Sequence, residues 1–516
     1  MESARTIASS ERQARVEVGV VLTSIFVIAT CGLIYELIIG TLSSYLLGDS
    51  IFQFSLTIGV FLTAMGLGSF VSRAVTRNLL GTFLAVEIAI GLLGGFSAAG
   101  LFGAFALFAN SYPIIMIATI VVLGTLIGLE IPVLTRLARR YGSLRHTLSN
   151  VLAFDYLGAL AASLLFPLIL LPYLGLSKTS FLVGMFNLLV VGLNLRVFGR
   201  AVPWGRLTAA ATLGALALLV AGFLQSATIT SLFEHRLYED QIIYSEQSRY
   251  QHIVVTRRLD IVQLWLDNEL QFSSRDEYRY HESLVHPALS LAPSLENVLI
   301  IGGGDGLAMR EALKYPGLQH ATLVDLDPSM TRLGQTFGPL VALNGGSLND
   351  PRVTVINADG FQFLAASRDL YQAIIVDLPD PRNENVARLY SREFYSLILQ
   401  HLARGGMFVT QASSPYYVRQ SFWCLAHTAA AAGLQVQAYH AYVPAFGDWG
   451  FVLGSNLKID WSRLAPRVPT RFLTSGVLPT MTVFDSDTSD VPTDVSTLEN
   501  PVVWRYYLAG WKNWRS

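Results

Sequence analysis

A glycine-rich turn with an acid inside it is the feature of this sequence most able to do chemistry. The apolar run 297–302 enters the glycines Gly302, Gly303 and Gly304, and Asp305 follows them directly. Glycines let a backbone turn sharply and approach a ligand closely. An acid inside the turn would repel a pyrophosphate, so a dinucleotide is disfavoured. A nucleoside with a cationic group, such as S-adenosylmethionine or another sulfonium, fits the turn better.

Acids and an amide also follow the other predicted strands. The candidate strands are 297–302, 321–326, 352–357, 371–377, 405–411, 434–443 and 449–454. The polar residues at their ends, besides Asp305, are Asp325 and Asp327, Asp359 and Gly360, Asp377 and Asp380, and Gln411. Ligands of a doubly wound α/β sheet bind at the carboxyl ends of its strands, so we expect these residues to share one site. Any single acid here could instead cap a helix N-terminus.

The elements that position these residues belong to two chemically different halves. Of the 516 residues 52% are hydrophobic and 14% are charged, whereas a soluble protein carries about 25% charged residues. The net charge of −1 gives no support for nucleic-acid binding. The charges are concentrated in the second half. We therefore expect an α-helical multi-span membrane domain over 1–225, a linker and β-hairpin subdomain over 226–295, a Rossmann-like α/β transferase domain over 296–460 and a C-terminal tail over 461–516.

The first half predicts a multi-pass protein of the cell membrane. Seven apolar runs reach the length of about 20 residues that spans a bilayer: 17–39, 51–72, 82–108, 112–135, 150–173, 178–197 and 206–225. Arginines gather in the N-terminal tail and the even-numbered loops: Arg5, Arg12, Arg15, Arg73, Arg77, Arg136, Arg139, Arg140, Arg145, Arg196, Arg200 and Arg206. The positive-inside rule then puts the N-terminus in the cytoplasm and, after seven spans, the second half outside. Sulfonium nucleosides are made inside cells, so the chemistry predicts a cytoplasmic second half instead.

Four acids, Glu36, Glu87, Glu130 and Asp155, lie within or near these spans. A carboxylate in a bilayer is costly and usually functional. One interpretation is that the acids pair with loop arginines or lie near the membrane interface, and the spacing of Glu130 and Arg136 suits it. A second is a cavity in the bundle that binds a cation, for example a polyamine. Proton coupling is a third.

Several motifs of the second half together resemble a known enzyme family. They are Tyr250-Gln251, the block DEYRYHE at 276–282, GGGDG at 302–306, VDLD at 324–327, Asp359-Gly360, DLPDP at 377–381, Gln411 and WGF at 449–451. GGGDG alone is moderately specific, but the preceding YHE and the following D-x-x-D-P make the signal strong. From about Tyr250 to Ser455 the chain resembles the polyamine aminopropyltransferases, the spermidine synthase family. Its first half is similar to that of a membrane-bound subgroup.

The resemblance implies transfer of an aminopropyl group from decarboxylated S-adenosylmethionine to a diamine such as putrescine, giving spermidine and methylthioadenosine. Asp377 would be the catalytic proton acceptor. The implied substrate-binding residues are Gln251, Tyr280, His281, Asp305, Asp325, Asp359, Gly360, Asp380 and Gln411. Among them, Asp325 would hold the ribose hydroxyls, Asp359 the adenine amino group and Asp380 the acceptor. No cofactor or metal is implied, because the donor is a co-substrate. A homodimer is expected, with the hairpin at 250–267 as a plausible contact.

Two departures from the family pattern leave the acceptor open. Arg382 to Arg388 stand where the family usually continues G-P-A, and Phe446 stands where the family often has a tyrosine. Methyl transfer from S-adenosylmethionine itself is one alternative, which Asp305 disfavours because it would repel the donor carboxylate. A transporter or sensor whose second half only binds polyamine or nucleoside is another. In the tail, 485–493 is predicted to be flexible, and the aromatic and basic residues after it suit a membrane interface or packing on the protein.

Overall fold

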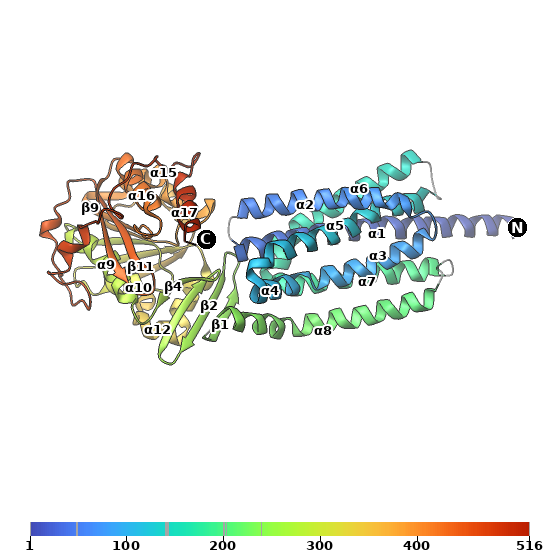
Figure 1. Ribbon diagram of the computed structural model, residues 1–516, viewed down its shortest axis with the longest axis horizontal. Helices are drawn as coiled ribbons and strands as arrows, with labels where there is room; N and C mark the ends of the chain where they lie inside the picture. Colours follow the sequence, from blue (N-terminus) through green and yellow to red (C-terminus); the bar gives the residue numbers. More distant parts are fainter. Residues whose placement is uncertain are drawn as a thin grey trace. The chain divides into compact units, whose positions relative to one another are not determined.

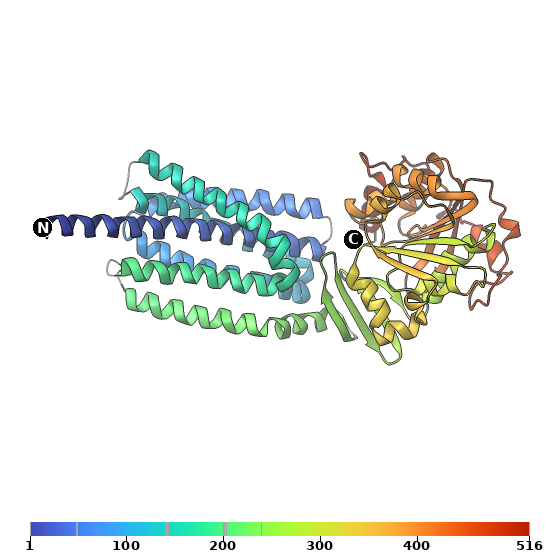
Figure 2. The same cartoon turned by 180° about the vertical axis from the view of Figure 1, so that it is seen from behind.

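The computed structural model describes residues 2–47, 50–139, 144–199, 202, 204–238 and 240–514 (Figures 1 and 2). The chain divides into two compact units, Met1–Glu239 and Asp240–Ser516. The first is helical and the second is built on two β-sheets.

The helical unit follows the predicted apolar runs. Its helices are α1 (Glu2–Leu47), α2 (Ser50–Val71), α3 (Leu79–Gly95), α4 (Ser97–Phe108), α5 (Tyr112–Ala138), α6 (Leu144–Leu165), α7 (Leu171–Phe198) and α8 (Gly205–Leu237). The run expected over 82–108 is not one helix, because the chain breaks at Phe96 after two glycines. The described helices contain five stretches long and apolar enough to cross a membrane: 16–47, 51–74, 97–137, 148–198 and 205–229.

Glycines let the helices of this unit approach closely. A Cβ added to Gly68 of α2 would lie 2.0 Å from the Thr125 carbonyl oxygen of α5. One added to Gly128 of α5 would lie 2.1 Å from the Met65 carbonyl oxygen of α2. No side chain fits at either position. Small residues at helix interfaces are typical of bundles in lipid, where the packing of backbones replaces the hydrophobic effect as the force between helices.

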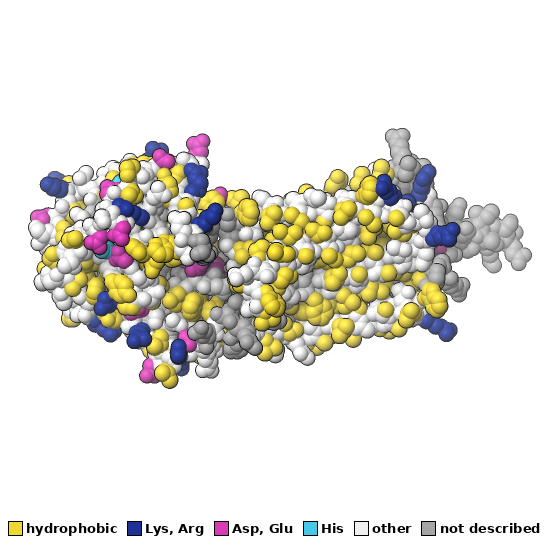
Figure 3. Space-filling view, viewed as in Figure 1, with side chains coloured by type: hydrophobic (Ala, Val, Ile, Leu, Met, Phe, Trp, Pro, Cys, Tyr) yellow, Lys and Arg dark blue, Asp and Glu magenta, His cyan; other side chains and the backbone are white. Residues whose placement is uncertain are grey.

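The surface of the helical unit is apolar along its length and basic at one end. Figure 3 shows hydrophobic side chains along the visible face and Lys or Arg side chains gathered at the end from which α1 starts. Large exposed hydrophobic residues include Leu62, Phe70, Ile114, Leu157, Leu189 and Leu213. The side chains of six predicted loop arginines lie outside the described set: Arg5, Arg12, Arg15, Arg140, Arg145 and Arg200.

The predicted pairing of Glu130 with Arg136 is wrong. The Arg136 guanidinium donates to the carbonyl oxygens of Ser72 and Val75, each at 2.8 Å, and to that of Pro132 at 3.2 Å. It therefore caps the carbonyls where α2 ends. Six residues are more than one and a half helical turns, so the two side chains point to different faces of α5.

A four-stranded antiparallel sheet opens the second unit. Its strands are β1 (Gln241–Gln247), β2 (His252–Arg258), β3 (Ile261–Leu266) and β4 (Glu269–Ser273), in sequence order. The strands of the expected hairpin are β2 and β3, with Ile253 opposite Leu266 and Arg258 opposite Ile261. Strand β1 begins where the sequence predicted a polar linker, because Ile242 pairs with Thr256 and Tyr244 with Val255 of β2.

The second sheet has seven strands in the order β10-β11-β9-β8-β5-β6-β7. These are β5 (Asn297–Gly302), β6 (His320–Asp325), β7 (Val353–Asn357), β8 (Tyr371–Asp377), β9 (Leu402–Gln411), β10 (Gln435–Val443) and β11 (Gly447–Ser455). All seven predicted strands are confirmed to within a few residues. Strands β9, β8, β5, β6 and β7 are parallel, while β10 and β11 add an antiparallel edge. The carboxyl ends of β5, β6, β7 and β8 therefore share one edge.

Helices cover both faces of this sheet. They are α9 (Glu277–Leu291), α10 (Leu307–Leu313), α11 (Pro328–Thr336), α12 (Gly338–Asn344), α13 (Gly360–Ala366), α14 (Glu384–Ala387), α15 (Arg392–His401), α16 (Arg419–Ala431) and α17 (Val502–Lys512). Successive residues of β5 alternate between two cores: Val298 and Ile300 pack with α9 and α10, and Leu299 and Ile301 pack with α15 and α16. This alternation is what the two-sided burial of a parallel strand requires.

The C-terminal tail packs on the second unit. The prediction that 485–493 is flexible is wrong, because Trp423 Nε1 donates to the Thr488 carbonyl at 2.9 Å and the Arg419 side chain donates to Ser489. Trp511 of α17 stacks on Tyr417 with ring centroids 5.3 Å apart. These aromatic residues therefore pack on the protein, which is the second of the two predicted alternatives, because α17 contacts α16.

Candidate active site

The glycine turn between β5 and α10 is closed by its contacts with neighbouring strand ends. Gly302, Gly303 and Gly306 have φ values of 83°, 65° and 82°, which side chains disfavour. A Cβ on Gly302 would lie 2.0 Å from the Asp377 carbonyl oxygen. The Gly303 N–H donates to that oxygen at 3.0 Å. The turn is therefore fixed directly against the end of β8.

Asp325 holds the other side of the turn, at the end of β6. Its Oδ2 accepts from the Gly304 N–H at 3.0 Å and its Oδ1 from the Asp327 N–H at 2.8 Å. The pKa of Asp325 is raised to about 6, chiefly by burial and also by the neighbouring charges of Asp327 and Asp305, although these hydrogen bonds act to lower it. Gln251 reaches the same strand end, where its Nε2 donates to Asp327 Oδ2 at 3.1 Å. The predicted ribose-binding acid and the predicted nucleoside-binding amide thus come together.

Asp377 lies at the centre of the acidic edge. The Tyr280 hydroxyl of α9 donates to its Oδ1 at 2.7 Å, and its Oδ2 lies 3.1 Å from where a Cβ of Gly303 would stand. Burial raises the pKa of Asp377, while the charge of His281 and the Tyr280 hydrogen bond lower it. An acid whose pKa is moved toward neutrality can accept a proton from an amine during reaction.

His281 is a buried cation beside two of these acids. Its Nδ1 forms a hydrogen bond of 2.9 Å with Glu277. Burial lowers the pKa of His281, but this bond and the charges of Glu277, Asp305 and Asp377 have the larger effect. The pKa of His281 is therefore raised to about 9. Arg310 holds the same Glu277 carboxylate with two bonds of 2.9 Å. The imidazolium therefore partly neutralises the site. Burial raises the pKa of Asp305 to about 6, and His281 opposes that shift.

Asp380 and Gln411 lie in a second group of polar residues next to Asp377. Asp380 Oδ1 accepts from the Ser413 hydroxyl at 2.6 Å. Gln411 Nε2 donates to the Tyr390 hydroxyl at 2.7 Å and to the Leu378 carbonyl at 2.8 Å. The pKa of Asp380 is raised to about 6, chiefly because the group is buried. The charge of Glu269 also raises this pKa, while hydrogen bonds from Ser413, Gln411 and Tyr507 lower it.

Asp359 and Gly360 lie at the end of β7, farther along the sheet edge. Asp359 caps α13, where its Oδ1 accepts from the Gln362 N–H at 3.0 Å, and its Oδ2 is ion-paired with Arg388. Gly360 is buried, and a Cβ there would lie 2.5 Å from Ile301 Cγ2. In the altered loop, Arg382 pairs with Asp267 at 3.0 Å. Phe446, the second departure, packs edge-on against Tyr280 with centroids 6.3 Å apart.

Sequence reasoning missed five residues that complete these groups: Tyr507, Glu269, Tyr390, Glu277 and Arg310. Tyr507 comes from α17, more than a hundred residues after Asp380, and Glu269 comes from β4. The acidic block before the turn was a signal for Glu277. The sequence carries no local signal for Tyr507 or Glu269, because only the folding of the tail and of the first sheet brings them to the site. Within the described residues, no three His, Cys, Asp or Glu side chains could jointly hold a metal ion.

Comparison with known proteins identifies the family. Residues 277–461 match the Spermine/spermidine synthase domain. The chain is 46% identical to Polyamine aminopropyltransferase 2 of Ralstonia nicotianae over 96% of its length and 98% of that protein's. It is 41% identical to the polyamine aminopropyltransferase of Leptospira interrogans over 95% of its length and 98% of that protein's. A spermidine synthase solved with the transition-state analogue AdoDATO aligns with a TM-score of 0.45 and 25% identity, covering 48% of this chain and 86% of its own. The chain therefore belongs to the enzyme family of the polyamine aminopropyltransferases.

Proposed function

We propose that this enzyme transfers the aminopropyl group to a diamine such as putrescine, giving spermidine and methylthioadenosine. The donor, decarboxylated S-adenosylmethionine, is a co-substrate and not a resident cofactor. The observation that carries the proposal is the position of Asp377, which adjoins the glycine turn and is hydrogen-bonded to Tyr280 at 2.7 Å. An acid in contact with the donor turn can receive the proton that the attacking amine loses.

The reaction is a displacement at the carbon next to the sulfonium. The amine nitrogen forms a bond to that carbon, the carbon–sulfur bond breaks, and its electron pair stays on sulfur as a thioether. Asp377 accepts the one proton that the ammonium of the acceptor loses to free its lone pair, and the product nitrogen is left as a secondary ammonium. A free alkylamine near pH 7 is mostly protonated, so the site must first bind a cation and then deprotonate it. Asp305 and Asp380 supply the negative charge, and holding both substrates in line lowers the barrier further.

The roles of the remaining residues follow from their places on the sheet edge. Asp325 lies beside the turn and would accept the ribose hydroxyls, with Gln251 next to it through Asp327. Asp359 and Gly360, one strand farther, would receive the adenine. Tyr280, His281 and Gln411 border the acceptor side.

The test is methylthioadenosine release by the full chain, given decarboxylated S-adenosylmethionine and a panel of diamines. We expect turnover with putrescine or a close homologue, and a loss of at least a hundredfold in Asp377→Asn, as removal of a general base costs about 10²–10⁴-fold. The matched control is Asp369→Asn, an acid outside the strand ends. Methyl transfer from S-adenosylmethionine without release of methylthioadenosine would refute the proposal.

We also propose that the helical unit anchors the enzyme in the cell membrane. The five long apolar stretches and the apolar surface with arginines at one end support this placement (Figure 3). On chemical grounds we place the catalytic unit in the cytoplasm, where the donor is made. Because α8 starts at the arginine-rich end and runs to the other (Figures 1 and 2), the positive-inside rule predicts the opposite facing. Alkaline phosphatase activity of a C-terminal fusion would overturn the cytoplasmic placement, and fluorescence of the matching green fluorescent protein fusion would support it.

A further inference from the structure

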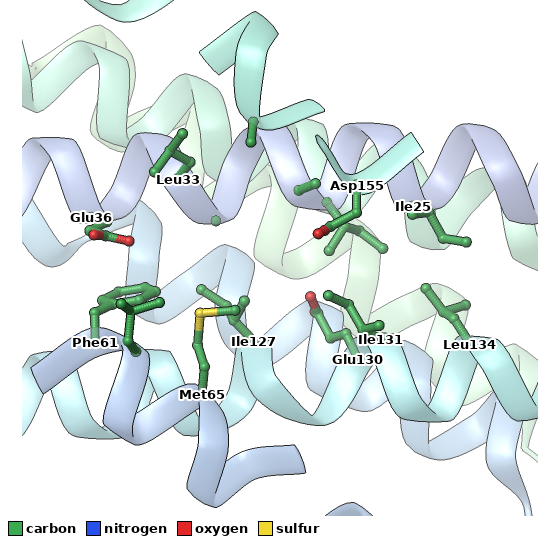
Figure 4. A pocket seen from close by; sticks show the side chains of 15 residues that line it. Ile25, Leu33, Glu36, Phe61, Met65, Ile127, Glu130, Ile131, Leu134 and Asp155 are labelled. Atoms are coloured by element: carbon green, nitrogen blue, oxygen red, sulfur yellow. The ribbon is translucent and has the colours of Figure 1, made fainter. Parts of the chain in front are cut away.

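A cavity of about 170 Å³ lies inside the helical unit (Figure 4). Its acids are Glu36 from α1, Glu130 from α5 and Asp155 from α6, and the side chains of all three point into it. The rest of its lining is aliphatic or aromatic, and no Lys, Arg or His of the described helices contributes. One water needs about 10–15 Å³ of such space, so a chain of several atoms fits.

The burial of Glu130 and its lack of a basic partner in the described helices indicate that a cation binds beside it. Its side chain is 2% exposed, and its carboxyl group lies against that of Glu87, which is 0% exposed. Among the described residues, no base, hydroxyl or amide forms a hydrogen bond with either carboxyl group. Arg136, the nearest base in the sequence of α5, donates instead to the carbonyls of Ser72 and Val75, which follow α2. A buried charge without a partner is strongly unfavourable, so a cation in the cavity would stabilise these acids.

The spacing of the acids indicates the shape of that cation. Helices α1 and α5 touch at Gly32 and Ile127, where an added Cβ would lie 3.3 Å from Ile127 Cγ2. Glu36 lies four residues beyond Gly32 and Glu130 three beyond Ile127 on helices that run in opposite directions (Figures 1 and 2). Seven residues at a rise of 1.5 Å separate the two acids by about 10 Å along the axis. Ile127, Met65 and Leu33 lie between them in Figure 4.

We propose that this cavity is a second amine site, which binds a short linear α,ω-diamine with one ammonium at Glu36 and the other at Glu130 and Asp155. The apolar wall between the acids contacts the methylene chain. A single inorganic cation would satisfy only one end. The proposal goes beyond the transfer reaction, and its ligand belongs to the class of the enzyme's own acceptor and product.

The experiment is equilibrium binding of radiolabelled putrescine to the full chain in lipid nanodiscs. We expect two sites per chain in the wild type and one in Glu36→Gln/Glu130→Gln, with aminopropyl transfer within twofold of wild type. Each single variant is expected to weaken the second site at least tenfold, because one ammonium loses its partner. Glu17→Gln, on α1 but outside the cavity lining, is the matched control and should keep both sites.

A second arm separates this site from the catalytic one. Asp377→Asn/Asp380→Asn should lose the catalytic amine site and keep the cavity site, even if the proposed transfer reaction is incorrect. The proposal fails if the cavity variants keep two sites, or if the catalytic variant binds no putrescine. It also fails if equimolar sodium displaces putrescine from the cavity as well as unlabelled putrescine does, since the cavity would then be an inorganic cation site.

Discussion

Replacement of Tyr280 by phenylalanine should move the acid limb of the pH profile without destroying the site. The Tyr280 hydroxyl donates to Asp377 at 2.7 Å and lowers its pKa. A hydrogen bond to a charged group contributes about 1.5–3 kcal/mol, and 1.36 kcal/mol corresponds to one pKa unit. Tyr280→Phe should therefore remove about 1.5–3 kcal/mol of stabilisation of the Asp377 carboxylate and raise its pKa. Asp377 must be deprotonated to act as the base, so activity should fall at a higher pH than in the wild type.

The assay is kcat/KM for the diamine, followed by methylthioadenosine release across the pH range. The same amine titrates with both enzymes, so the difference between the two profiles isolates the enzyme group. Tyr278→Phe is the matched control, because this tyrosine of the same helix packs against Arg471 instead. An acid limb that stays in place, or a uniform loss at every pH, would refute the reasoning that Tyr280 acts through the charge of Asp377.

Three further changes should separate binding from stability. Arg388→Gln should strengthen donor binding two- to tenfold by calorimetry, since it frees the Asp359 oxygen that the arginine occupies; weaker binding would show that Arg388 instead orients Asp359. Asp380→Asn should raise the diamine KM about tenfold or more, because one charged hydrogen bond is lost. The donor KM should stay within twofold of wild type, and an equal rise of both KM values would contradict the place of Asp380 on the acceptor side. Glu282→Gln should lower the free energy of unfolding in urea by about 1–3 kcal/mol, because this buried carboxylate accepts three backbone N–H groups at 471–473; an unchanged midpoint would count against that role.

The strand ends could be predicted because the apolar run and the glycine or acid that ends it are adjacent in the sequence. An apolar run that ends in glycine or an acid marks where a buried strand leaves the sheet, and the parallel order then brings Asp305, Asp325 and Asp377 to one edge. The break at Phe96 was missed because both helices around it are equally apolar, so hydropathy alone gives no boundary.

Side-chain partners were predicted less well because they depend on long-range packing. The Arg388–Asp359 pair joins residues on two different loops. The polar composition of 485–493 is typical of a flexible segment, but its backbone carbonyls meet donors on α16. Glu130 and Arg136 are close in the sequence and yet face different neighbours, since the helix rotates about 100° at each residue.

The contact between Gly302 and Asp377 has a consequence for segment exchange between relatives. The donor turn and the base share a backbone hydrogen bond, from Gly303 N–H to the Asp377 carbonyl at 3.0 Å, and the strands that carry them pair in register at these two positions. A chimera that takes 302–306 from one parent and 377–381 from another would join surfaces shaped for different neighbours. Exchanging both segments together preserves the fit, so these two stretches, 71 positions apart, form one unit of recombination.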